Sequence, residues 1–247
     1  MRQFYITLSR AFRLLLKALT FRVPIRALRY GLLNKINYMV KCGDRRYDFE
    51  RRYLENPDPW NYNLSQYEIE KYRLTLEGAL KWGRNQRRAL EVGCSVGVFT
   101  RMLAVQYDEV TAMDISGEAI RIAARHPENT KNVLFLRADL LSVQLPGTFD
   151  AIFCAEVLYY IKSADIPLAC ANIDKYLADD GILVMVTGCA ELVVDSKDWN
   201  QVFQQYYDLL FSHKVQDERR PYVMFIYARR GASKAPRERS PVAPETA

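Results

Sequence analysis

Six short apolar runs separated by helical patterns constrain the fold of this chain more than any other feature of its sequence. Residues 98–107, 117–126, 164–178 and 198–211 have the apolar spacing of amphipathic helices. Strands that alternate with helices form parallel sheets with right-handed crossovers. We therefore predict an α/β protein with a doubly wound, Rossmann-like and mainly parallel seven-stranded sheet. The six runs cover residues 88–92, 110–114, 133–137, 149–155, 182–187 and 222–228.

Charge divides the chain into a basic leader and an ordinary domain. Residues 1–43 hold nine of the 35 Lys and Arg residues and none of the 29 Asp and Glu residues. The tail is rich in proline, alanine and charge, a composition that is typical of disorder. The predicted organisation is a basic amphipathic leader (1–45), a helical lid or cap (46–85), the main domain (86–230) and a disordered tail (231–247).

The leader is predicted to form two helices separated near Pro24, with Arg10, Arg13 and Lys17 on one face of the first. A cationic amphipathic helix can lie in the plane of an anionic membrane surface. Its apolar face can equally pack on the protein's own body or dock a partner such as a glycosyltransferase, and a mitochondrial transit peptide is a third reading. No window of about 18 apolar residues indicates a spanning helix.

The cysteines favour a reducing compartment, so we expect the protein in the cytoplasm. The basic leader adds the possibility of peripheral attachment to a membrane. Five cysteines are scattered along the chain and form no C-x-x-C pair. That pattern argues against a disulfide framework and against a zinc site, so we expect no bound metal.

A glycine loop follows the first predicted strand in the stretch EVGCSVG. A phosphate-binding loop needs a Gly-Lys pair, which this sequence lacks. A dinucleotide loop needs G-x-G-x-x-G, and two of its three glycine positions are occupied by Ser95 and Val98. The pattern that remains is E-x-G-x-x-x-G, formed by Glu91, Gly93 and Gly97.

A ligand with an amino-acid end suits this loop, because an acidic strand end attracts its ammonium group and helix-end amides hold its carboxylate. S-adenosylmethionine is such a ligand. Asp114, after the second strand, is placed to bind ribose hydroxyls, and Asp139, after the third, to bind the adenine amine. Their neighbours Cys94, Ile115 and Leu140 are predicted to line the same site. The alternative is that the acidic residues are ordinary strand-end caps.

The chain resembles the class I S-adenosylmethionine-dependent methyltransferases over residues 48–188, and within them the nodulation protein S type. The resemblance implies methyl transfer, which in the nodulation enzymes goes to the free amine of a chitooligosaccharide sugar. The motifs that carry it are EVGCSVGVFT (91–100), TAMDIS (111–116), FLRADL (135–140), FDAIFCAEVLYYI (149–161) and, most discriminating, DPWNYNLSQYEIEKYRLTL (58–76).

The acceptor is expected at the loop after the fourth strand. An amine must be neutral to attack and must lose a proton, so a nearby carboxylate is useful. We assign Glu156 to acceptor binding and proton removal, and Tyr159 and Tyr160 to acceptor orientation. The alternative is that Glu156 caps the next helix and that the two tyrosines belong to the core.

The segment before the sheet is predicted to cover the site. Ser65 and Glu68 form an S-x-x-E capping box at the start of a helix. On that helix, Lys71 is a candidate ligand of the cofactor carboxylate. Trp60 offers a flat surface to the cofactor, or else only pins the leader to the sheet.

Nucleic acid is an unfavourable acceptor, since Cys154-Ala155-Glu156 lacks the Asp/Asn-Pro-Pro-aromatic run of base-amine methyltransferases. The leader also lacks aromatic interleaving of the sort that stacks bases. A small-molecule acceptor, a saccharide or a glycolipid precursor, is the first hypothesis. The second is a non-catalytic or RNA-directed protein of the same fold that is docked to a partner through its leader. The atom methylated, nitrogen or oxygen, stays open at this point.

Overall fold

The computed structural model of the protein describes residues 45–126, 131–189, 193–194, 197–217 and 220–232. The predicted leader up to residue 44, and the predicted tail beyond Ala232, lie outside the described residues. Within the described part, no helix has the length and apolar character needed to cross a membrane. The cysteines at 94, 154, 170 and 189 are free thiols.

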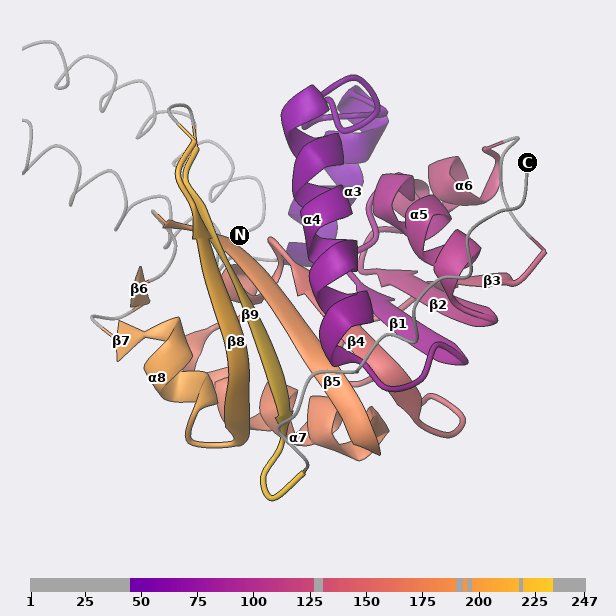
Figure 1. Cartoon of the computed structure of the whole chain (residues 1–247). Helices are drawn as coiled ribbons and strands as arrows, with labels where there is room; N and C mark the ends of the chain where they lie inside the picture. Colours follow the sequence, from indigo (N-terminus) through magenta and orange to yellow (C-terminus); the bar gives the residue numbers. More distant parts are fainter. Residues whose placement is uncertain (1–44, 127–130, 190–192, 195–196, 218–219, 233–247) are drawn as a thin grey trace, which may run out of the picture. The chain divides into compact units, whose positions relative to one another are not determined.

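A seven-stranded sheet with the order β3-β2-β1-β4-β5-β9-β8 forms the centre of the protein (Figure 1). The first five strands in this order run parallel. Strand β9 is antiparallel to β5, and β8 is antiparallel to β9. The predicted fold class is confirmed. The strands are β1 (Arg88–Val92), β2 (Glu109–Asp114), β3 (Val133–Arg137), β4 (Phe149–Ala155), β5 (Leu177–Gly188), β8 (Tyr207–Val215) and β9 (Tyr222–Arg229), with a separate small pair of β6 (Val193–Val194) and β7 (Lys197–Asp198).

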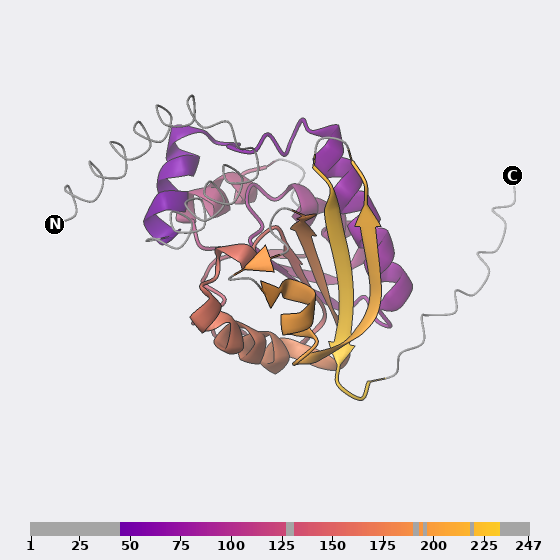
Figure 2. The same ribbon diagram turned by 90° about the vertical axis from the view of Figure 1, so that its left-hand side faces the viewer.

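Helices cover both faces of the sheet, as Figure 2 shows with α4 on one side and α7 and α8 on the other. Each face has its own apolar core. Tyr72 and Leu76 of α4 pack with Phe99 of α5, whereas Ile173 of α7 packs with Phe203 of α8. The helices are α3 (Arg45–Glu55), α4 (Gln66–Trp82), α5 (Val98–Gln106), α6 (Gly117–Ala124), α7 (Ile166–Tyr176) and α8 (Trp199–Phe203).

The helix predicted over residues 198–211 is wrong beyond its first turns. The structure has a five-residue helix, α8, and then the strand β8. Strand β8 pairs with β9 from Tyr207 opposite Arg229 to Val215 opposite Tyr222. Its ladder of backbone hydrogen bonds outweighs the local helical spacing, because tertiary pairing overrides residue propensity.

The segment between the leader and the sheet contains α3 and α4. Ser65 caps α4, and its hydroxyl accepts a hydrogen bond from the Glu68 backbone N–H at 3.3 Å. The reciprocal half of the predicted capping box is absent, because the Ser65 N–H donates to the Asn61 carbonyl instead. The Glu68 carboxylate is therefore available for another partner.

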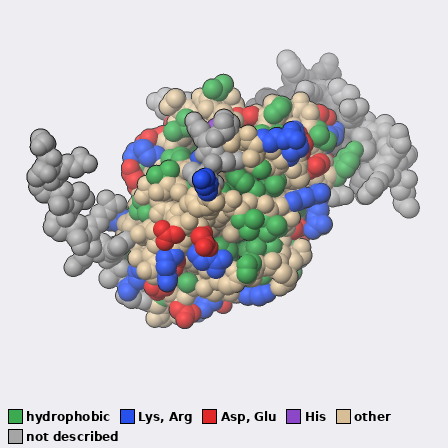
Figure 3. Space-filling view, turned by 90° about the vertical axis from the view of Figure 1, so that its right-hand side faces the viewer, with side chains coloured by type: hydrophobic (Ala, Val, Ile, Leu, Met, Phe, Trp, Pro, Cys, Tyr) green, Lys and Arg blue, Asp and Glu red, His purple; other side chains and the backbone are tan. Residues whose placement is uncertain are grey.

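The face on the side of α5, α6 and β3 carries a band of apolar side chains beside mixed acidic and basic ones (Figure 3). Val105 and Leu134 are exposed large apolar residues of α5 and β3. Single exposed apolar residues are common on soluble proteins, and we assign this face no role.

Candidate active site

The loop after β1 has three residues in the left-handed region, at alternate positions. Gly93 and Gly97 both have φ +79, and Ser95 has φ +53. Such a conformation is rare for serine and is retained where the surroundings fix it. Here the Ser95 N–H donates to the Asp114 carboxylate at 3.0 Å, and the Ser95 hydroxyl accepts from the Tyr53 hydroxyl at 2.7 Å. The loop is thus held in one shape from both sides.

The two glycines let neighbouring elements approach this loop. A Cβ atom at Gly93 would lie 2.8 Å from Val157 Cγ2, directly after Glu156. At Gly97, it would lie 3.2 Å from Ala123 Cβ of α6. Glycine at position 93 brings the loop after β1 against the loop after β4, and glycine at position 97 brings it against α6. Cys94, between them, is buried.

Asp114, at the end of β2, is only 7% exposed and points its carboxylate into the glycine loop. One carboxylate oxygen accepts the Ser95 N–H, and the other accepts the Ser116 N–H at 2.9 Å. Burial raises its pKa from 3.8 to about 6, and the backbone hydrogen bonds, including one from Ile115, partly oppose this rise. Each oxygen keeps a lone pair that a hydroxyl group can use.

Glu91 lies beside Asp114 and is 5% exposed. The Thr100 hydroxyl of α5 donates to its carboxylate at 2.6 Å. Burial raises the pKa of Glu91 from 4.5 to about 7, Thr100 lowers it, and the charge of Asp114 raises it further. A cation placed here would lower that pKa and would be held strongly in return.

One face of α3 meets the ends of three strands, which the sequence did not reveal. Arg46 forms a salt bridge with Asp139 at 3.3 Å, and Glu50 accepts the Ser116 hydroxyl at 2.7 Å. Together with Tyr53, these residues follow the i, i+4, i+7 spacing of a helix face, which is the signal that could have revealed them.

The remaining residues predicted near the cofactor lie in different surroundings. Leu140 is buried in the apolar core under α7, and Ile115 is half-buried. Trp60 packs in a small aromatic cluster, with its ring stacked on Tyr62 at 5.8 Å and edge-on to Tyr53 at 5.5 Å.

Glu156, at the end of β4, is fixed through both its backbone and its carboxylate. Its φ is +54, its N–H donates to the Val186 carbonyl at 2.8 Å, and one carboxylate oxygen accepts the Gly188 N–H at 3.2 Å. The other oxygen meets the Lys71 ammonium group at 3.1 Å. Glu156 does not cap the following helical turn, because that turn has no side-chain cap.

Lys71 is 1% exposed and lies between two carboxylates. Besides Glu156, its ammonium group meets Glu68 at 2.7 Å, and Arg220 approaches Glu68 at 3.8 Å. The structure thus places Lys71 in contact with Glu156, the residue predicted for the acceptor. Sequence reasoning assigned no site role to Glu68 or Arg220, and Arg220 comes from the far connection between β8 and β9.

Tyrosines surround this cluster as neutral groups. Burial and the charge of Glu68 raise the pKa of Tyr62 and Tyr67, and burial with the charges of Glu70 and Glu68 raises that of Tyr222 to about 12. These phenols therefore stay protonated at neutral pH. The Tyr67 hydroxyl donates to the Arg220 carbonyl at 2.6 Å, which ties α4 to the β8–β9 connection.

The two tyrosines predicted to orient the acceptor lie against each other, with ring centroids 4.6 Å apart. Tyr159 is buried in the apolar core, which favours the structural alternative for it. Tyr160 is half-buried and packs edge-on against Phe49 of α3 at 4.9 Å.

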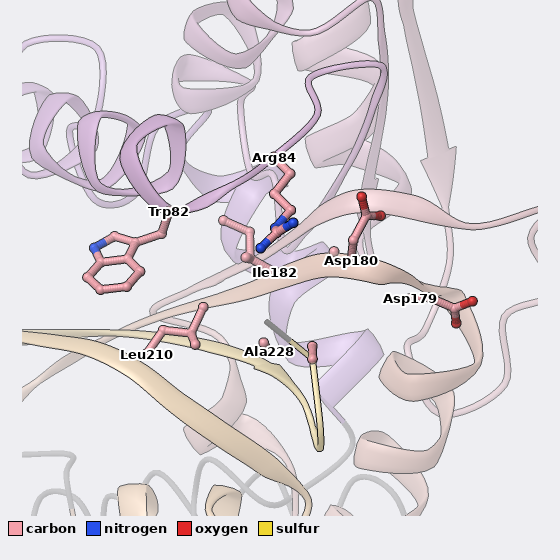
Figure 4. A pocket seen from close by; sticks show the side chains of 9 residues that line it. Trp82, Arg84, Asp179, Asp180, Ile182, Leu210 and Ala228 are labelled. Atoms are coloured by element: carbon pink, nitrogen blue, oxygen red, sulfur yellow. The ribbon is translucent and has the colours of Figure 1, made fainter. Parts of the chain in front are cut away.

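A pocket on the protein lies away from these residues, at the amino end of β5 (Figure 4). In Figure 4, Arg84 lies next to Ile182 with Asp180 beside them, while Asp179 lies farther away. Because the glycine loop and Glu156 follow the carboxyl ends of parallel strands, this pocket belongs to the opposite end of the sheet. Its lining is Trp82, Arg84, Asp179, Asp180, Gly181, Ile182, Leu210, Ala228 and Ala232.

Comparison with protein families gives a match that covers more than half of the chain. Residues 42–206 match the model of the family described as Nodulation protein S (NodS). The nodulation protein S of Azorhizobium caulinodans is 32% identical over 135 residues, covering 54% of this chain and 64% of the relative. The chain therefore spans less than two thirds of the length of that relative.

Two further relatives broaden the comparison. The ubiquinone biosynthesis O-methyltransferase of Burkholderia multivorans is 34% identical over 93 residues, which is 36% of this chain and 40% of the relative. The crystal structure of the N-methyltransferase NodS from Bradyrhizobium japonicum WM9, in complex with S-adenosyl-L-homocysteine, superimposes with a TM-score of 0.64. The two sequences are 23% identical, and the superposition covers 76% of this chain and 100% of the other. It establishes a shared fold.

Proposed function

The chain belongs to the Nodulation protein S (NodS) family, and on that premise we propose that it is an S-adenosylmethionine-dependent methyltransferase that methylates an amine of a saccharide. The observation that carries the proposal is the buried Asp114 carboxylate, fixed by one backbone N–H on each oxygen at the glycine loop. A carboxylate oriented in this way and retaining free lone pairs suits the two hydroxyls of a ribose.

The residues around the glycine loop, which we call the cofactor end of the site, fit an S-adenosylmethionine molecule. Asp114 would hold the ribose, and Glu91 would hold the ammonium group of the amino-acid end. Asp139, whose other oxygen accepts the Leu141 N–H at 3.0 Å, is proposed to receive the adenine amine. When bound, the cofactor supplies a methyl group on a positively charged sulfur. The loop of Gly93 and Gly97 brings the protein backbone close to it.

Most of the catalysis is proposed to come from alignment, because methyl transfer is an in-line displacement that needs little acid or base chemistry. The protein must still accept the proton that an amine loses. Glu156 is the group proposed for this, since its carboxylate is fixed by Gly188 N–H and Lys71 at the mouth of the site. The surrounding tyrosines, which stay protonated, can donate hydrogen bonds to the acceptor but cannot remove its proton.

An amine fits this site better than a hydroxyl group. A carboxylate is far too weak a base to ionise an alkyl hydroxyl, whereas a neutral amine attacks without losing a proton first, and the carboxylate can relay to solvent the proton that the product ammonium group then loses. The solved relative with the same fold is an N-methyltransferase, and the resemblance to the nodulation enzymes implies an aminosugar. We therefore favour nitrogen as the methylated atom, with a chitooligosaccharide as the first acceptor to test.

The test is calorimetric titration with S-adenosylhomocysteine, followed by transfer of a labelled methyl group to a chitooligosaccharide with a free terminal amine. We expect micromolar binding by the wild-type chain and its loss in Asp114→Asn, with the exposed Asp108→Asn as the matched control. Absence of binding by the folded wild-type chain would overturn the proposed function and favour a docking role for the protein.

We also propose that residues 1–43 place the enzyme at an anionic membrane surface. The support is the leader's nine basic residues and its lack of acidic ones. Flotation with vesicles that contain anionic lipid should carry the wild-type chain upward. The variant with Arg10, Arg13 and Lys17 replaced by Gln should stay at the bottom, whereas equal flotation of both chains would contradict the proposal.

A further inference from the structure

Two buried carboxylates lie where an amine acceptor is expected, and this raises a problem of charge. Glu68 and Glu156 are both nearly inaccessible to solvent. An uncompensated carboxylate beside an amine stabilises the ammonium form and raises the pKa of the amine. An ammonium group has no lone pair and cannot attack a methyl group. A site with two such carboxylates would bind the unreactive form of its own substrate.

Lys71 resolves this problem in the structure. Its ammonium group is shared between Glu68 at 2.7 Å and Glu156 at 3.1 Å, and Arg220 lies 3.8 Å from Glu68. Two negative and two positive groups therefore face one another from α4, the end of β4 and the β8–β9 connection. The phenol groups that also face this cluster are those of Tyr62, Tyr67, Tyr72, Tyr159, Tyr160 and Tyr222.

We propose that Lys71 is a positioning residue of the acceptor site, which balances Glu68 and Glu156 so that an amine acceptor binds in its neutral, nucleophilic form. This inference rests on the proposed function. We propose it in place of a contact between Lys71 and the cofactor carboxylate, because the ammonium group lies between two carboxylates of the protein itself and over the rings of Tyr67 and Tyr222.

The pH dependence of kcat for methyl transfer, which reports the ionisation of groups in the enzyme–substrate complex, tests this role in three variants. Lys71→Met leaves two carboxylates facing a single positive group, Arg220, so the alkaline pH at which the amine becomes reactive should rise by about one unit or more, with about a tenfold loss of rate at neutral pH. Lys71→Arg keeps the charge and should keep the wild-type profile. Glu68→Gln/Lys71→Met removes one charge of each sign, so its profile should return close to that of the wild type.

The double variant also decides the question if Lys71→Met fails to fold, because it contains no unbalanced buried charge. A double variant as impaired as Lys71→Met, with an unshifted profile, would mean that Lys71 acts only by orienting Glu156, and the inference would be overturned. Loss of S-adenosylhomocysteine affinity in both Met variants would overturn it in favour of a cofactor role. Failure of the wild-type chain to bind S-adenosylhomocysteine would instead refute the proposed function itself.

Discussion

The two ends of the candidate active site treat buried carboxylates in opposite ways. At the cofactor end, Glu91 and Asp114 are held by a hydroxyl group and by backbone N–H groups and, within the part of the chain that the structure describes, form no salt bridge. At the acceptor end, Glu68 and Glu156 share the ammonium group of Lys71. The four carboxylates are buried to a similar extent, so the two ends differ in the groups that hold the carboxylates.

This contrast matches the charges of the two proposed ligands. The cofactor brings an ammonium group and a sulfonium, so buried carboxylates such as Glu91 and Asp114, which form no salt bridge among the described residues, gain the most on binding. The acceptor must arrive neutral, so an acceptor end that contains its own cation avoids trapping it. Under the proposed function, the partners of the buried carboxylates at each end suit the charge of the ligand that binds there.

The largest effect should come from removing the negative charge of Glu156 at the acceptor end. Glu156→Gln keeps the shape of the side chain but cannot take a proton, so methyl transfer should fall about 10²-fold or more. S-adenosylhomocysteine affinity should stay unchanged, because the cofactor end is untouched. Single-turnover assays measure the rate of methyl transfer and calorimetric titration measures the affinity, with the exposed Glu70→Gln as the control. Equal losses of rate and affinity would mean that the two ends are not separable.

Glu91→Gln at the cofactor end should have an intermediate effect on affinity. Loss of a charge-assisted hydrogen bond to an ammonium group should weaken S-adenosylhomocysteine binding about tenfold to a hundredfold. In the wild-type chain, binding should tighten as the pH rises through about 7, since Glu91 must ionise, and calorimetry should detect proton release. The exposed Glu109→Gln is the control, and pH-independent binding would refute a role for Glu91.

The same Glu91→Gln variant should be more stable than the wild-type chain without ligand. Because the folded-state pKa of Glu91 is raised from 4.5 to about 7, its contribution to stability is full below pH 4.5 and is lost as the pH rises through 7. At about 1.4 kcal/mol per pKa unit, this loss is on the order of 3 kcal/mol. Urea denaturation should show a higher free energy of unfolding for the variant than for the wild-type chain at pH 8, and no such difference near pH 4. Equal stability of the two chains at pH 8 would contradict this prediction.

The smallest effect is expected at the outer edge of the cofactor end. The Arg46 side chain is 59% exposed in its salt bridge with Asp139, and exposed pairs contribute at most about 1 kcal/mol. Arg46→Met should therefore weaken S-adenosylhomocysteine binding by less than about fivefold, and the exposed Arg52→Met should leave it unchanged. A loss comparable to that of Glu91→Gln would show that α3 acts directly on the cofactor.

The sequence predicted most of the sheet because parallel strands are continuous apolar runs. The predicted strands at 88–92, 133–137 and 149–155 coincide with β1, β3 and β4. Strand β8 was missed for a physical reason. Trp199, Phe203, Tyr207 and Leu210 recur at helical spacing, and only pairing with β9 makes the second half of that segment a strand.

Site residues that follow strands were predictable, and those that depend on long-range docking were not. Glu91, Asp114 and Glu156 follow from the rule that ligands bind at the carboxyl ends of parallel strands. Nothing in the sequence says that Lys71 meets Glu156, 85 residues away. Arg220 was equally invisible, since its place depends on how the β8–β9 connection folds back.

The hydrogen bond from Tyr67 to the Arg220 carbonyl joins residues 153 positions apart, which has a consequence for biosynthesis. Residues 88–155, with the glycine loop and Asp114, leave the ribosome well before Arg220 does, and contacts of such long separation form slowly. A nascent chain that stops short of Arg220 already contains the proposed donor half of the enzyme but lacks part of the proposed acceptor half. Translation therefore completes the proposed donor half before the proposed acceptor half.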